Sequence, residues 1–357
     1  MLPALPRRLI GYGAYNLCFD NMLGRPANQP NGPDFFHALR QRAPCVNLVK
    51  VIVYRNAGIE GLNHFPDRRE PLYTGDREIN DYFLNNLRTL VDTAAGFNPK
   101  FWVQVCIFSY HSVAALTRDL NAPSGYDPIP PEQPENVPRE LVVPPPPPPP
   151  PGKKPTMPNP IDNARWFFNP TGDARLHAQK QLVAVLGQTL RGCTNVIWEL
   201  ANELRISNQP GFDVDDRATV LWLNQMRDAL RSNAGPDIHI TTSTGINNET
   251  TLLRGVPLTV FDFHSGQWEV ADHYTTGIPH AIQRAASYNP AGAVIINDDG
   301  ITGGATGIPR NQPNVTAWAK TAFQNGVHYN TKAPYPPAED FSAQQIAALT
   351  DANNSVK

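Results

Sequence analysis

Residues Asn195–Glu203 read Asn-Val-Ile-Trp-Glu-Leu-Ala-Asn-Glu, and this stretch decides the fold of the 357-residue chain. Its β-branched and aromatic start is typical of a parallel strand that is covered on both faces. Asn202 and Glu203 follow at the carboxyl end of that strand. A parallel strand that ends in Asn-Glu places an amide and a carboxylate where (β/α)8 barrels keep their active sites. The alternative is a first helical turn with solvated glutamates, which the turn residues around Gly192 disfavour.

Seven further segments have the apolar pattern of strands, and helical patterns separate them. The expected strands are Arg8–Phe19, Val46–Tyr54, Phe101–Ser109, His239–Ser243, Leu258–His264, Ala293–Asp298 and Val327–Asn330. The expected helices are Phe35–Arg42, Asp76–Ala95, Asp173–Leu190, Asp215–Asn233, Ile278–Ser287, Val315–Asn325 and Ser342–Leu349. Alternating strands and helices predict an α/β protein, a single (β/α)8 TIM barrel over residues 1–357. A doubly wound open sheet is the alternative, although no glycine-rich phosphate loop follows the first strand.

The prolines are concentrated in one segment. Of 37 prolines, 17 fall within residues 121–160, including an unbroken run from Pro144 to Pro151. Such a run adopts polyproline II at about 3.1 Å per residue, and is roughly 25 Å long. We interpret it as a stiff proline-rich insertion after the third strand, because barrel-like units continue on both sides. Docking of SH3- or WW-type partners is an alternative use.

Composition excludes several classes of function. A formal net charge of −2 and a pI near 6.5 leave no electrostatic footprint for nucleic acid. No apolar run approaches the roughly 18–20 residues that span a bilayer, so no membrane partner is expected. The amino terminus has no extended apolar region of a signal peptide, which predicts an intracellular protein or a secreted one whose signal was removed. Four cysteines are scattered without metal or redox spacing, so we expect no metal and no cofactor. The oligomeric state is left open.

The hexapeptide Trp198–Glu203 resembles the fourth strand of clan A glycoside hydrolases, nearest to family 5 enzymes of the β-mannanase type. The resemblance implies a retaining glycosidase whose partner is a β-linked oligo- or polysaccharide. It implies that Glu203 is the acid/base and that Asn202 contacts a sugar 2-hydroxyl. The family motif commonly continues Asn-Glu-Pro-Arg, whereas this chain has Leu204 in place of the proline and keeps Arg205.

The second catalytic carboxylate is expected on the seventh strand. Residues Ile295–Gly300 resemble the clan A segment in which an apolar run ends in the nucleophile, and Asp298 matches that nucleophile. The family has Glu there. An Asp is shorter by about 1.3–1.5 Å, which would widen the carboxyl gap from the retaining range of roughly 5–5.5 Å towards the inverting one. Asp299 is the alternative if the strand ends one residue later, since only one of two adjacent side chains points inward.

Polar and aromatic residues near the other strand ends are the predicted sugar contacts. His264 resembles a clan A histidine near the nucleophile, and Lys50 stands nearest to the arginine that orients it, although lysine lacks the guanidinium fork. The family's eighth-strand tryptophan is absent, so Trp268 or Tyr329 would replace it. The complete set of predicted substrate-binding residues is Asn202, His264, His111, Trp268, Tyr329, Asn16 and Asp299.

Two rival functions remain. The departures at Leu204, Lys50 and Asp298 favour a catalytically impaired sugar-binding barrel. A metal-dependent barrel hydrolase would use Asp262, His264, Asp272, His273 and Asp298. Barrel metal sites usually carry a His-x-His pair on an early strand, and this chain has none. The sequence does not select the sugar, the linkage, or endo over exo action.

Overall fold

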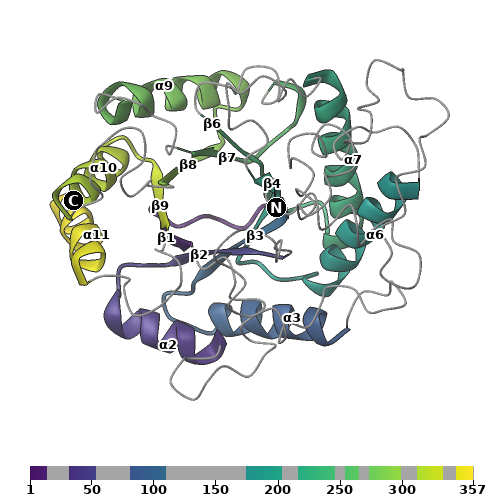
Figure 1. Ribbon diagram of the computed structural model, residues 1–357, viewed down its shortest axis with the longest axis horizontal. Helices are drawn as coiled ribbons and strands as arrows, with labels where there is room; N and C mark the ends of the chain where they lie inside the picture. Colours follow the sequence, from purple (N-terminus) through teal and green to yellow (C-terminus); the bar gives the residue numbers. More distant parts are fainter. Residues whose placement is uncertain are drawn as a thin grey trace, which may run out of the picture.

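The structure is a computed structural model that describes residues 1–13, 32–53, 81–109, 174–202, 216–245, 254–264, 273–298, 312–332 and 343–356. In these ranges the strands form a ring that the helices surround (Figure 1). The proline-rich insertion at residues 121–160 lies outside the described residues.

All strand pairs of the ring are parallel. The strands are β1 (Ile10–Gly13), β2 (Leu48–Ile52), β3 (Trp102–Ser109), β4 (Val196–Asn202), β5 (His239–Thr241), β6 (Ser243–Gly245), β7 (Val260–His264), β8 (Ala293–Asp298) and β9 (His328–Lys332). They pair in the order β5-β4-β3-β2-β1-β9-β8-β7-β6. Because β5 and β6 are halves of one strand separated by a single residue, the ring is a nearly closed eight-stranded barrel. The predicted (β/α)8 fold is confirmed, and the open-sheet alternative is wrong.

Thr242 lies at the break between the two half-strands. β5 pairs with β4, whereas β6 pairs with β7, so the chain changes neighbours at this residue. The Thr242 hydroxyl donates to the carbonyl of Ala201 at 2.9 Å. On the other side, the Ile240 N–H donates to Thr259 Oγ1 at 2.8 Å. Side-chain hydroxyls therefore replace ladder hydrogen bonds where the barrel closes.

Helices cover the outer surface of the barrel (Figure 1). They are α2 (Gly32–Arg42), α3 (Asp81–Ala95), α6 (Ala174–Thr189), α7 (Asp216–Ala234), α9 (His273–Tyr288), α10 (Gln312–Gln324) and α11 (Ala343–Ser355). Each coincides with a predicted helix. In α3, Phe83, Leu87 and Leu90 recur at helical spacing and are fully buried. None of the described helices has both the length and the apolar character needed to span a membrane.

The inside of the barrel has two layers. An apolar layer lies near the amino ends of the strands and consists of Leu9, Leu48, Trp102, Ile197, Val260 and Ile295. Two residues further along each strand the side chain returns to the same face. Those positions hold Gly11, Lys50, Gln104, Glu199, Asp262 and Asn297, with Thr241 and Asn330 from the remaining strands. The barrel interior therefore changes from apolar to polar towards the carboxyl ends of the strands.

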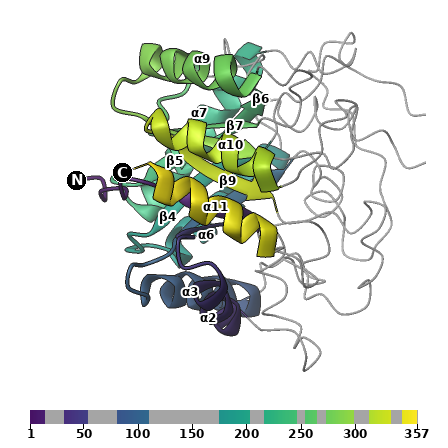
Figure 2. The ribbon, with the colours of Figure 1, turned by 90° about the vertical axis from the view of Figure 1, so that its left-hand side faces the viewer.

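The amino-terminal segment lies against the apolar layer and holds two buried histidines. Leu5 packs on that layer. Nε2 of His239 is 2.7 Å from the carbonyl oxygen of Pro3, and the N–H of Leu9 donates to Nδ1 of His328 at 2.9 Å. Burial lowers the pKa of both histidines, that of His328 to about 4. Both chain ends lie at one end of the barrel (Figure 2).

His328 should make the folded state sensitive to acid. Its pKa is about 4 when folded against 6.5 for an ordinary histidine, so between these values the unfolded chain binds the extra proton. The contribution of His328 to the unfolding free energy is fully present above pH 6.5. This contribution falls by about 3 kcal/mol as the pH drops to about 4. We expect His328→Gln to flatten this part of the curve of unfolding free energy against pH, measured by chemical denaturation. His177→Gln, at an exposed position of α6, is the control. Equal slopes in H328Q and parent would contradict the assignment.

Candidate active site

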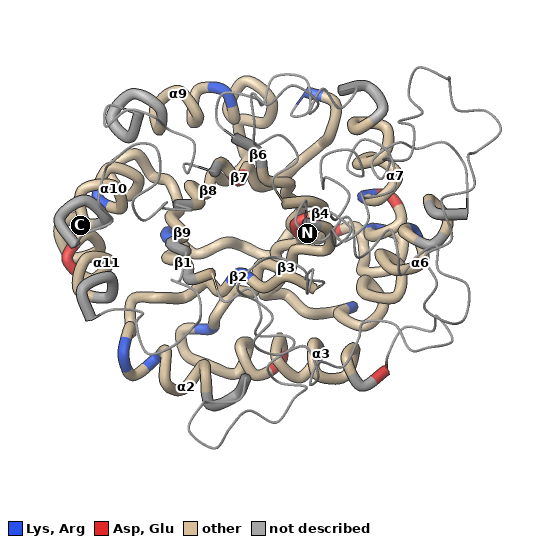
Figure 3. Tube along the Cα trace, viewed as in Figure 1, with Lys and Arg blue, Asp and Glu red and all other residues tan. Residues whose placement is uncertain are grey.

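In the part of the chain that the structure describes, the charged side chains inside the barrel form one cluster. Figure 3 shows most charged residues of the described chain on the helices and connections. Among the described residues, the Lys, Arg, Asp and Glu side chains that are buried are Lys50, Glu199 and Asp262, at 0%, 0% and 1% exposure. They come from β2, β4 and β7, and we call them the buried charge cluster. Charged groups are buried in proteins only where partners compensate for their lost hydration. The contacts among Lys50, Glu199 and Asp262 must therefore supply this compensation.

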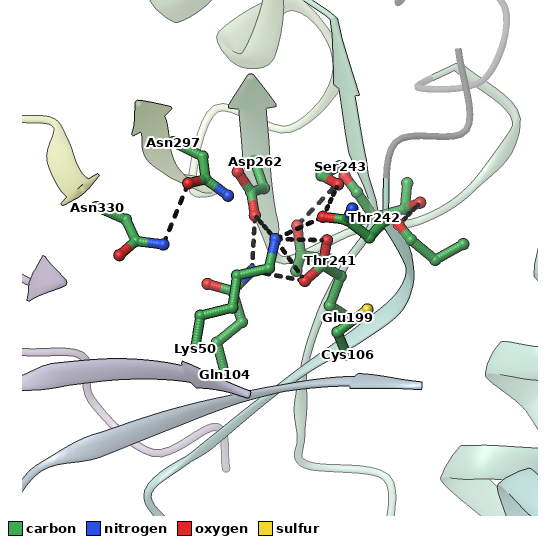
Figure 4. Close-up of polar contacts among 12 residues, drawn as sticks. Lys50, Gln104, Cys106, Glu199, Thr241, Thr242, Ser243, Asp262, Asn297 and Asn330 are labelled. Carbon is green, nitrogen blue, oxygen red and sulfur yellow. Dashed lines mark hydrogen bonds and ion pairs between the residues drawn. The ribbon is translucent and has the colours of Figure 1, made fainter. Parts of the chain in front are cut away.

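The Lys50 ammonium is the centre of the buried charge cluster (Figure 4). Its Nζ lies 2.9 Å and 3.0 Å from the two carboxylate oxygens of Glu199. Oδ2 of Asp262 is 3.6 Å from Nζ, and Oδ1 of Asn202 accepts from it at 2.8 Å. The cation from β2 is thus held by acceptors from two other strands, β4 and β7.

Gln104, from β3, bridges the two carboxylates of the cluster. Its Nε2 donates to Oε2 of Glu199 at 3.0 Å and to Oδ2 of Asp262 at 2.6 Å. Oε1 of Gln104 and Oδ1 of Asp262 are buried without a hydrogen-bond partner in the part of the chain that the structure describes. The amide bridge lets two acidic groups approach one another, because it supplies a donor to each.

The pKa of Glu199 is raised, with burial as the largest cause. The neighbouring Asp262 raises it further, whereas Lys50 and a hydrogen bond with Ser243 lower it. Two carboxyl groups share one ammonium, so only one of the negative charges is neutralised by a cation of the cluster. Burial and the neighbouring carboxylate therefore favour the protonated form of Glu199 more than in an exposed glutamate.

The opposite side of the polar layer is neutral. Nδ2 of Asn330 donates to Oδ1 of Asn297 at 3.2 Å across β9 and β8. Asn330 also occupies the space in front of Gly11, where an added Cβ would lie only 2.6 Å from its Oδ1. A glycine is needed at this position because the amide fills the volume that a side chain from β1 would take.

Asn202 is the point at which the cluster meets the carboxyl edge of the barrel. Strict alternation along β4 would place it on the helix-facing side with Trp198 and Leu200, which belong to the outer core. Instead its Oδ1 accepts from Lys50 inside the barrel and from the Ser243 hydroxyl at 3.2 Å. The alternation therefore changes between Glu199 and Asn202.

Strand β3 shifts alongside β4. Cys106 pairs in register with Glu199, and Phe108 with Ala201. Unbroken alternation would put Phe108 inside the barrel with Gln104, yet its ring packs on Trp222 of α7 at 5.3 Å between centroids. The two neighbouring strands thus change face together, and their pairing keeps the same register on both sides of the change while Asn202 turns inward.

The described residues bring only part of the predicted site together. Asn202, His264 and Asp298 are the last residues of β4, β7 and β8, so their backbones reach the same edge of the barrel. Of these, the structure describes the side chain of Asn202 only. The predicted site residues outside the described ranges are Glu203, Asp299, His111, Trp268 and Asn16. Their roles stay predictions.

Tyr329 is fully buried in the core between the barrel and its helices. Its ring packs edge to face on Phe323 of α10, with centroids 6.4 Å apart. Core packing explains this side chain without a sugar, and its role in substrate binding stays a prediction.

Sequence reasoning missed the site role of three residues. Gln104 and Glu199 are hidden inside apolar strand patterns, and the sequence suggests Asp262 only as a metal ligand. The signal was present as a polar residue two positions after an inward apolar one, as in Trp102 and Gln104. For the metal-dependent rival, the described residues contain no group of three or more His, Cys, Asp or Glu suited to hold an ion.

Comparison with known proteins gives the fold but no family. No protein-family model matches this chain, and no curated protein matches it. Among solved structures, endo-glycoceramidase II from Rhodococcus sp. is similar at 14% identity and TM-score 0.57, covering 96% of this chain and 78% of that one. A family 5 lichenase from Caldicellulosiruptor sp. F32 is similar at 11% identity and TM-score 0.55, over 96% and 92% of the two chains.

A third solved structure is the family 5 xyloglucanase from Bacteroides ovatus, at 13% identity and TM-score 0.55. It covers 97% of this chain and 75% of that one. At these identities the similarity shows a shared (β/α)8 barrel fold. Function needs arguments from the site itself.

The buried charge cluster should respond unequally to loss of its cation and of an acid. Lys50→Met leaves two carboxylates buried without a cation and should lower the unfolding free energy by about 3–5 kcal/mol. Glu199→Gln leaves one ammonium with one carboxylate and should cost only about 1 kcal/mol. Because the pKa of folded Glu199 is raised, the parent loses stability as pH rises through that pKa, and Glu199→Gln removes this loss.

Urea denaturation of both variants at several pH values measures these differences. Lys180→Met on α6, a partly exposed lysine, is the matched control and should stay within about 0.5 kcal/mol of the parent. If Lys50→Met costs no more than Lys180→Met, the ammonium does not hold the cluster together.

Proposed function

We propose that this protein is a glycoside hydrolase that cleaves a β-linked oligo- or polysaccharide with two carboxyl groups. Glu203 is the proton donor, and Asp298 is the opposing carboxylate. The observation that carries the proposal is the inward turn of Asn202 at the carboxyl edge of β4, anchored by Lys50 and Ser243. An amide held at that edge stands directly before Glu203 in the chain, where barrel enzymes keep catalytic groups.

The comparisons support the same class of reaction. The three similar structures named above are glycosidases by name, and they share the barrel over most of this chain. A common fold alone carries many chemistries. The Trp-Glu-Leu-Ala-Asn-Glu sequence adds a local argument, because it puts a carboxylate after the anchored amide.

In the proposed mechanism, Glu203 protonates the glycosidic oxygen while Asp298 attacks the anomeric carbon. The bond to the leaving sugar breaks, and a covalent glycosyl-enzyme forms on the aspartate. Glu203 then removes a proton from water, which attacks the same carbon and releases the second sugar. Asn202 donates its amide N–H to a sugar hydroxyl oxygen throughout.

Asp299 is the alternative partner, and the alternation of β8 bears on the choice. Ile295 and Asn297 belong to the barrel interior, whereas Val294 and Ile296 belong to the helix-facing core. If this alternation continued, the side chain of Asp299 would point into the barrel. Asp298 would point inward only after a change of side like that of β4 at Asn202. Its match to the clan A nucleophile keeps Asp298 as the first choice, and both aspartates are tested.

A sugar-binding barrel without catalysis is the second candidate. The specific observation that favours it is the engagement of Lys50, whose ammonium is held by Glu199 and Asn202 within the barrel. Lys50 stands nearest to the position of the clan A arginine that orients the nucleophile, and a lysine offers a point charge without the guanidinium fork. Binding of glycans without any turnover would select this candidate.

Glu203→Gln tests the proton donor. On a natural glycan the variant should lose about 10²–10⁴-fold in kcat, because acid assistance to the leaving group is lost. On aryl glycosides with activated leaving groups the loss should be far smaller. A glycan panel with reducing-sugar detection identifies the substrate, and Asp228→Asn on the exposed face of α7 is the control. Parent-like activity of E203Q on the natural glycan would overturn the assignment.

The opposing carboxylate is tested with Asp298→Ala and Asp299→Ala. The variant that lacks the nucleophile should be nearly inactive and should regain activity in azide, which attacks the anomeric carbon in its place. Proton NMR of the first product should show the anomer of the substrate. An inverted first product would instead make the aspartate a base that acts through water, as its shorter side chain allows.

A further inference from the structure

We infer that Lys50 and Ser243 are positioning residues that lock the side-chain amide of Asn202, so that it can only donate to the bound sugar. This inference rests on the proposed function, because it concerns how the same site recognises its substrate. The contact that carries it is the double occupation of Asn202 Oδ1, by Lys50 Nζ at 2.8 Å and by the Ser243 hydroxyl at 3.2 Å.

The chemistry of the donors fixes which way the amide points. The oxygen and nitrogen of an asparagine look alike, and their assignment normally depends on the surrounding network. A lysine ammonium has three donors and no acceptor, so the atom that faces Lys50 must be Oδ1. A flipped amide would place its N–H groups against an ammonium and lose the hydrogen bond from Lys50. Nδ2 is therefore the end of Asn202 that lies away from the cluster.

The two residues that hold Asn202 are themselves held in place by their surroundings. Lys50 and Ser243 are both fully buried, and Lys50 is held by both oxygens of Glu199. Asn202 keeps 5% exposure, more than either of its anchors. No described residue accepts a hydrogen bond from its Nδ2 in the structure. A polar group that is held by buried neighbours loses little freedom when a ligand binds, which is how a supporting shell raises affinity and rate.

A locked amide also selects its ligand. With Oδ1 occupied, Asn202 presents N–H donors only, and the group that meets it must be an acceptor. A sugar hydroxyl oxygen satisfies this condition, and so does a fluorine, weakly. A protonated amine that replaces this hydroxyl on the sugar brings only donors, so the site should reject it. A free asparagine, by contrast, could rotate to accept from that amine.

Ser243→Ala is the sharpest test, because Lys50→Met also strips the cation from a buried cluster and tests folding instead. The matched control is Thr241→Val, which removes a hydroxyl from an equally buried position of the same strand. Oγ1 of Thr241 donates to the carbonyl of Thr242 at 3.5 Å, and the hydrogen bonds that Oδ1 of Asn202 accepts come from Lys50 and Ser243. The Ser243 hydroxyl has a single proton, and Glu199 competes with Asn202 for it. Loss of the hydroxyl in Ser243→Ala should therefore have a moderate effect on Asn202.

On a glycoside with a 2-hydroxyl, we expect Ser243→Ala to lower kcat/KM by about 3- to 10-fold, as for one hydrogen bond. On the matching 2-deoxy glycoside the two enzymes should be equal, and Thr241→Val should match the parent on both. In the Asn202→Ala background Ser243→Ala should have no further effect, because Ser243 acts through Asn202. In Ser243→Ala, kcat/KM for the 2-amino-2-deoxy glycoside should rise relative to kcat/KM for the 2-hydroxyl glycoside.

A second readout does not depend on activity. In protein labelled with ¹⁵N-asparagine, the side-chain N–H pair of Asn202 is assigned by its absence from Asn202→Ala. Ser243→Ala should shift or broaden this pair, and Thr241→Val should not. Unchanged signals in Ser243→Ala would overturn the positioning role whatever the enzyme does. Shifted signals in a protein that neither binds nor hydrolyses any glycan would keep the positioning role and reject the proposed function.

Discussion

The structure depends on one buried ammonium. Lys50 lies inside the barrel without exposure and is compensated by Glu199, Asp262 and the amide oxygen of Asn202. Removing ions from water costs several kcal/mol each, and the attraction between them repays this only with good geometry. The geometry exists only when β2, β4 and β7 hold their present register. A slip of one residue would turn Lys50 to the helix-facing side, so the cluster penalises wrong pairings.

The same cluster connects stability to the proposed chemistry. Below it, the apolar layer and the amino-terminal segment fill the barrel and supply ordinary hydrophobic stabilisation. Above it, Asn202 lies at the edge where barrel active sites form. A polar layer between the two is expensive, because every donor and acceptor in it needs a partner. Its cost is offset if it holds a substrate-binding amide rigid, and that is the use we propose for Lys50.

Local pattern was sufficient for the elements of the fold. Seven expected helices and eight expected strands are found, since apolar periodicity depends on neighbours within a few residues. The boundaries differ where local signals are weak. Helix α9 begins at His273 and not at Ile278, so Pro279 lies inside it, where it lacks the N–H that would donate to the carbonyl of Thr275. The fifth strand divides at Thr242, which periodicity alone does not indicate, since barrel closure requires the chain to change partners there.

The order of strands and helices, the (β/α)8 barrel and the polar residues near the strand ends could all be predicted from the amino-acid pattern. The contacts of Lys50 with Glu199 and Asn202, which are 149 and 152 positions away in the chain, follow only from the folded barrel. The folded barrel also determines that Asn202 faces inward against the alternation of β4. The physical reason is that these contacts depend on strand register and barrel closure, which join residues far apart in sequence. Periodicity within one strand carries no information about where its neighbours place their charges.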